Sequence, residues 1–172
     1  MAAVDVLGTV ADRLVQGMMF HGEHADLCAY LGVWWLAGIH EDGYEHDNRC
    51  LRKVRRLSIE YLGLPVPEGR QERGHSLDAF RGMKRWDVSS DAIGPALKDA
   101  MHAWIDWEAG TVTVLTSSAS RLMDSGELLL YDRVKKIAND TSKELANARD
   151  LMREMEAVCW DMSHVLQMSG RN

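Results

Sequence analysis

The prolines of this 172-residue chain are confined to one short stretch. They are Pro65, Pro67 and Pro95, so residues 1–64 and 96–172 contain none. Proline breaks helices because it lacks a backbone N–H and its ring clashes with the preceding turn. A chain of this length most often forms one domain. The distribution therefore predicts two long helical halves joined by one broken connector, and it argues against a β-sandwich or a barrel.

The composition narrows the class of protein further. Hydrophobic residues make up 46% and charged residues 27%, which is an ordinary globular balance. The net charge of −6 disfavours a dedicated nucleic-acid binder. No apolar run approaches the ~18 residues of a membrane span, and the N-terminus lacks the basic region of a signal peptide. The three cysteines are widely spaced and odd in number, so we expect packed, reduced thiols in a cytoplasmic protein.

Apolar residues at alternating intervals of three and four predict four long helices. Gly32 and Gly126 are expected in the turns, and Gly94-Pro95 is expected to open the third helix, since proline suits the first helical position. Residues 111–116 are β-branched, but helical periodicity on both sides predicts helix there. The expected parts are a first hairpin (4–62), a crossover (63–93) that contains a short helix over 76–84, and a second hairpin (94–168).

The long crossover sets the direction of the predicted helices. It can span the second helix end to end, so it makes the second and third helices parallel, as in ferritin-like bundles. The predicted fold is therefore an all-α, ferritin-like four-helix bundle built from two antiparallel hairpins. Trp34 and Trp35 are expected to cover one end of it.

Each predicted helix has a line of apolar residues that faces the core, which we call its seam. Four polar residues interrupt these seams: His21, His46, Glu108 and Glu144. Counted from the turn near 125–126, Glu108 and Glu144 share a level. Counted from the turn near 33, His21 and His46 share one as well.

Two carboxylates and two imidazoles inside one bundle suit iron, manganese or zinc. A divalent cation would offset the cost of burying an ionised carboxylate, which is several kcal/mol. Asp140, Glu45 and His24 lie close enough in sequence to support such a site. Gly43 costs about 1 kcal/mol inside a helix, and a close approach of backbone or ligand would explain it.

Other interpretations of these residues stay open. Each seam histidine can be a hydrogen-bonded core residue, and Glu108 can simply pair with His46. The bundle can then be a metal-free structural or interaction protein. A basic run on the second helix is either a solvated face or a phosphate-binding stripe: Arg49, Arg52, Lys53, Arg55 and Arg56.

The chain resembles the ferritin-like superfamily, and within it an uncharacterised group met in bacterial and phage genomes. The resemblance covers nearly the whole chain and is carried by diffuse motifs: Gly17-Met18-Met19, His21, Ala25-Asp26, His40-Glu41 and Leu51-Arg52-Lys53.

The resemblance implies a set of metal ligands. Ferritin-like di-iron proteins place a Glu on the first and third helices and Glu-x-x-His on the second and fourth. Glu108 matches the third-helix position and Glu144 begins the fourth-helix motif. The chain departs from the pattern at Gly43, at Asn147 and on the first helix, where the seam offers His21. It therefore suits a single metal ion, an altered site or a vestigial one.

The resemblance also implies redox chemistry on the metal, namely oxidation of Fe(II) by dioxygen or peroxide for storage or detoxification. By analogy with the superfamily, the basic run from Arg49 to Arg56 offers a DNA-protecting role as an alternative. We expect the chain to form a homo-oligomer, and we expect neither a membrane nor a nucleic acid as a partner.

Overall fold

The computed structural model describes residues 2–67 and 90–168, in which every regular element is a helix. The elements are α1 (Ala3–Tyr30), α2 (Trp34–Leu57), the π-helical turn η1 (Ser58–Leu62), α3 (Ser90–Asp124), α4 (Leu128–Ala157) and α5 (Met162–Val165). The prediction of an all-α fold is confirmed, and so is the helical state of residues 111–116. None of the described helices is long and apolar enough to cross a bilayer.

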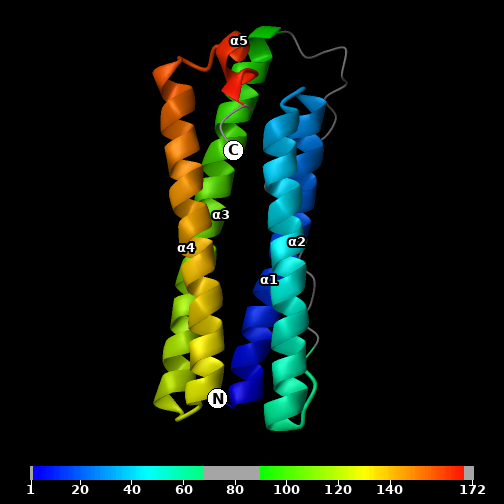
Figure 1. Ribbon diagram of the computed structural model, residues 1–172, viewed down its shortest axis with the longest axis vertical. Coiled ribbons are helices and arrows are strands. Elements are labelled where there is room, and N and C mark those ends of the chain that lie inside the picture. The colour runs from blue at the N-terminus through cyan, green and yellow to red at the C-terminus, as the bar shows by residue number, and fades with distance from the viewer. Residues whose placement is uncertain (1, 68–89, 169–172) are drawn as a thin grey trace.

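The four long helices lie side by side as two hairpins (Figure 1). α1 packs against α2 and α3 against α4, and α1 also packs against α3 between the hairpins. Figure 1 shows α2 and α3 running in the same direction. Gly32 and Gly126 make the two tight turns with φ of 82° and 81°, a left-handed conformation that glycine adopts without a steric penalty.

The start of α3 differs from the prediction. Pro95 does not open the helix but lies inside it, since α3 begins at Ser90. The ring removes only one hydrogen bond from the second turn, and burial of Ala96 and Leu97 just beyond it holds the helix together. Most of the predicted crossover, with its short helix over 76–84, lies outside the described residues.

The C-terminal end also differs, because α4 stops at Ala157 and the chain turns back. Trp160 adopts a positive φ of 57° at this reversal, and α5 then places Val165 in the core. Trp35 donates its indole N–H to the Val165 carbonyl at 3.0 Å. Trp34 is 69% exposed, so only one of the two tryptophans covers this end of the molecule.

The cysteines are all free, but they are not all packed. Cys28 and Cys50 are buried as predicted. Cys159 is exposed, because it lies in the chain reversal after α4.

Two apolar clusters fill the core, one toward each end of the long helices. The cluster near the α1–α2 turn contains Leu36, Leu97 and Met155, and the cluster near the opposite end contains Leu14, Val54 and Leu115. On α2, α3 and α4 the polar seam residues lie between these clusters in sequence, and on α1 His21 directly follows Phe20, the first residue of the cluster near the α1–α2 turn. The fold therefore sets a polar belt across its middle.

Candidate functional site

A buried ion pair joins α1 to α3 in this belt. His21 Nε2 lies 3.3 Å from Oε1 of Glu108, and only 4% and 2% of the two side chains are exposed. Trp104, one turn before Glu108, donates its indole N–H to the same oxygen at 3.1 Å. Burying an unpaired carboxylate costs several kcal/mol, so these two partners are what stabilise Glu108 in the core.

Two further histidines extend the pair toward α2. His40 Nδ1 lies 3.1 Å from His21 Nδ1, and the His24 ring stacks on Phe20 and donates Nδ1–H to its carbonyl. Burial lowers the pKa of His40 well below its usual value and that of His24 to about 4, so both rings are neutral at pH 7. A neutral His40 can accept a hydrogen bond from His21. His21 thus contacts His40 through Nδ1 and Glu108 through Nε2.

Gly43 leaves the space that the His21 ring occupies. A β-carbon at Gly43 would lie 2.8 Å from His21 Cε1 and 2.9 Å from Nδ1. The interior glycine of α2 is thus explained by the close approach of a side chain. Gly17 on α1 has a similar role, since a β-carbon there would collide with the Asp47 carboxylate.

Asp47 is the carboxylate that sequence reasoning missed. Burial raises the pKa of Asp47 to about 7, against the influence of His21, while the nearby carboxylates of Glu108 and Glu144 add to the rise. A signal for Asp47 existed in the sequence. Two lines of residues on α2 follow the three-four spacing equally well. One is the seam through His46, and the other contains positions 36, 40, 43, 47, 50 and 54. Both lines therefore face the inside of the protein.

A second pair joins α2 to α4. His46 Nδ1 lies 3.1 Å from Oε1 of Glu144, with side chains 20% and 31% exposed. The contact is an ion pair without hydrogen-bond geometry. His46 Nε2 lies 3.5 Å from Cys50 Sγ. The Cys50 contact and then the Glu144 carboxylate raise the pKa of His46 to about 10, so the ring is cationic at pH 7.

A half-buried arginine adds positive charge beside the belt. Arg13 donates to Thr111 Oγ1 at 2.9 Å and to the Trp107 carbonyl at 3.0 Å, and its guanidinium lies over the Trp107 ring. Burial lowers the pKa of Arg13, and the carboxylates of Glu108 and Asp47 counter that effect. The cation ties α1 to α3 and partly balances the acidic side chains.

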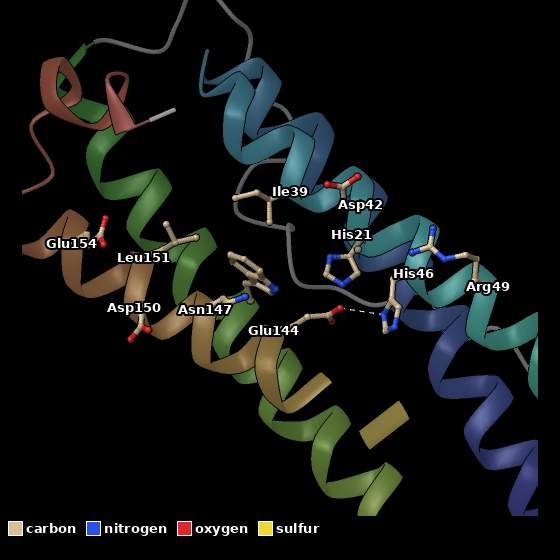
Figure 2. Close-up of a pocket in the computed structure, with 12 residues that line it drawn as sticks. His21, Ile39, Asp42, His46, Arg49, Glu144, Asn147, Asp150, Leu151 and Glu154 are labelled. Atoms are coloured by element: carbon tan, nitrogen blue, oxygen red, sulfur yellow. Dashed lines mark ion pairs between the residues drawn. The ribbon is translucent and has the colours of Figure 1, made fainter. Parts of the chain in front are cut away.

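A pocket of about 710 Å³ lies beside the two pairs, between α2 and α4. Figure 2 shows the His46 and Glu144 side chains pointing toward each other and joined by their ion pair, with His21 close by. Trp104 also lines the pocket, whereas Glu108 lies behind His21 and is not part of the wall. Asp42, Asp150 and Glu154 add carboxylates to the wall, and Arg49 adds a cation.

The structure brings the four predicted residues together as two pairs. His21 contacts Glu108 and His46 contacts Glu144, so the alternative pairing of Glu108 with His46 does not form. Over residues 2–67 and 90–168, no group of three or more His, Cys, Asp or Glu side chains is arranged to hold a metal ion. The donors therefore share one region of the bundle without forming a closed coordination shell.

The predicted supporting residues divide between the site and the surface. His24 belongs to the buried histidine group. Glu45 lines a separate groove between α1 and α2. Asp140 forms an ion pair with Lys143 on α4 at 2.9 Å and does not line the pocket.

Comparison with known proteins adds no assignment to this geometry. No protein-family model matches the chain, and no curated protein sequence is significantly similar to it.

Proposed function

We propose that this protein is a ferritin-like helical bundle that binds a divalent metal ion, such as iron, manganese or zinc, in the pocket between its hairpins. One observation carries the proposal. Two histidine–carboxylate pairs, drawn from all four long helices, lie beside one pocket, and three of their four side chains line it: His21, His46 and Glu144.

The side chains around the pocket carry ligand atoms that suit such an ion. Imidazole nitrogen and carboxylate oxygen are the ligands that suit iron, manganese and zinc. His21, His46 and Glu144 line the pocket and would hold the ion, and Glu108 would support His21 from behind. Glu144 now faces the His46 imidazole at 3.1 Å, and this imidazole is the partner that a cation would replace.

The residues of the chain would position the ion and control its surroundings. Trp104 fixes Glu108 by its hydrogen bond, and Gly43 gives the His21 ring room. The apolar clusters border the belt on both sides, while His46 and Glu144 stay partly exposed at the pocket. A bound iron ion would supply one-electron chemistry with dioxygen or peroxide.

Calorimetric titration tests the proposal. Mn²⁺, Zn²⁺ and, without oxygen, Fe²⁺ are titrated into the wild type, the Glu144→Gln variant and the Asp140→Asn variant. Asp140 is the matched control, since it lies one turn from Glu144 and pairs with Lys143 outside the pocket. We expect the wild type and Asp140→Asn to bind alike and Glu144→Gln to bind at least about tenfold more weakly. Equal binding by all three, or no binding, contradicts the proposal.

A second candidate is a metal-free structural protein that keeps the bundle, and the ion pairs themselves favour it. A cationic His46 beside Glu144, and a Glu108 held by Trp104 and His21, stabilise the contact between hairpins without a ligand. Thermal unfolding separates the candidates. A metal that binds the native state raises the midpoint of the wild type but not of Glu144→Gln, whereas a purely structural role gives no shift in either.

A further inference from the structure

The outward face of α2 and η1 carries positive and negative charge in separate halves. Six exposed side chains share this face at intervals of three, four or seven residues, and we call them the outer α2 stripe: Trp34, Glu41, Glu45, Arg52, Arg56 and Ile59. The order along the stripe is an exposed aromatic residue, two acids, two bases and an exposed aliphatic residue. Trp34 and Ile59 are 69% and 60% exposed.

This order is self-complementary under a twofold rotation. Let two copies of α2 run antiparallel, with the axis midway between Glu45 and Arg52. Glu45 of one copy then lies opposite Arg52 of the other, and Glu41 lies opposite Arg56, because both pairs are centred on the same point of the helix. A parallel arrangement would place like charges together. The charge pattern therefore selects one direction and one register.

The ends of the stripe match as well. In the antiparallel register, Ile59 of one copy lies about one helical turn from Trp34 of the other, at each end of the contact. The pairing would cover four of the large exposed apolar side chains of two copies. Apolar contacts at the ends and charge pairs in the centre give the contact both a hydrophobic contribution and specificity.

The charged side chains in the centre are available for a partner. Across the described part of the chain, neither Glu45 nor Arg52 forms an ion pair or hydrogen bond, while Arg56 holds Glu60 at 2.6 Å. A groove of about 540 Å³ runs beside the acidic half, between α1 and α2. Its wall includes Asp26, Glu41 and Glu45. In the antiparallel register, the arginines of the second copy lie over this acidic groove.

We propose that two copies of this chain associate antiparallel along the outer α2 stripe. The contact leaves the pocket between α2 and α4 untouched, because His46, which faces Glu144 on α4, lies on a different side of α2 from the outer α2 stripe. The association is therefore independent of any metal bound in that pocket.

Sedimentation equilibrium on charge-reversed variants tests the association. The wild type is expected to have twice the mass of the 19.4 kDa chain. Glu45→Arg alone and Arg52→Glu alone each place like charges opposite each other and are expected to be monomeric. An equal mixture of the two variants restores both opposite-charge pairs, so a dimer with one chain of each is expected. The double variant with both changes in one chain is expected to dimerise with itself for the same reason.

Controls separate this surface from a general effect of charge. Arg149 and Glu156 are exposed on α4 with the same seven-residue spacing, so Arg149→Glu and Glu156→Arg should leave the dimer intact. Circular dichroism checks that each variant folds. For the wild type itself, raising the NaCl concentration from 0.05 M to 0.5 M should weaken association by about tenfold or more, since exposed charge pairs are screened. A monomeric wild type, a salt-insensitive dimer, dimeric single variants or a monomeric mixture would each overturn the proposal.

Discussion

Gly43 on α2 faces the His21 ring on α1 so closely that a β-carbon would lie 2.8 Å from Cε1. The ring cannot easily move away, because Glu108 contacts one of its nitrogens and His40 contacts the other. The close contact between α1 and α2 at the belt therefore requires glycine at position 43.

We expect Gly43→Ala to destabilise the protein by about 1–3 kcal/mol, because the added methyl overpacks a buried contact. Urea unfolding measures the change. Gly38→Ala is the matched control on the same helix, since a β-carbon there meets no atom within 4 Å. It should stabilise the protein by about 0.5–1 kcal/mol through helix propensity. Equal effects of both substitutions would show that His21 does not occupy this space.

The two carboxylates of the predicted site should differ in their structural contribution. In protein freed of metal by a chelator, Glu108→Ala should cost about 3–5 kcal/mol, because it leaves His21 and Trp104 buried without their acceptor. Glu144→Ala should cost less than about 1 kcal/mol, since the His46–Glu144 pair is partly exposed. Urea unfolding of both variants measures the costs, and similar values would contradict the difference in burial.

Asp47 should make stability depend on pH. Burial raises its pKa from 3.8 to about 7, so the folded state holds a proton that the unfolded state releases near pH 4. The stabilisation is complete below pH 3.8 and is lost as pH rises through 7. In metal-free protein, Asp47→Asn should therefore increase the free energy of unfolding at pH 8 relative to the wild type.

The gain in the free energy of unfolding from Asp47→Asn at pH 8 has an upper limit. It is at most about 4 kcal/mol, because each pKa unit corresponds to about 1.4 kcal/mol, and it should disappear at pH 4. A difference between Asp47→Asn and the wild type that stays constant from pH 4 to pH 8 would rule out a titrating Asp47.

The cysteines should react according to their exposure. Burial raises the pKa of the Cys28 thiol to about 12, and Cys50 is also buried, whereas Cys159 is exposed. A coloured disulfide reagent at pH 8 should therefore modify one thiol per chain quickly and the other two only in denaturant. Cys159→Ser should remove the fast reaction. Fast reaction of a second thiol would contradict the packing around α1 and α2.

The helices were predictable from the sequence because helical hydrogen bonds are local and the apolar spacing repeats along each one. The start of α3 and the reversal at Trp160 were not predictable. Both depend on contacts between segments far apart in the chain, such as Gly94 against the Trp160 carbonyl and Trp35 against Val165.

The site was predictable in its residues but not in its pairing. Seam spacing identified His21 and Glu108, yet it did not indicate which histidine each carboxylate contacts. That choice depends on how each helix rotates about its axis, and a rotation of one residue exchanges His46 for Asp47 at the interface. His40 was missed for the same reason, since it lies on the second inward seam of α2.

Elemental analysis of the wild type, after expression with added iron and manganese, tests the central claim that the pocket binds a metal. We expect about one metal ion per chain in the wild type and in Asp140→Asn, and a much smaller amount in the double variant His46→Gln/Glu144→Gln. Wild-type protein that carries no more metal than this double variant would contradict the claim.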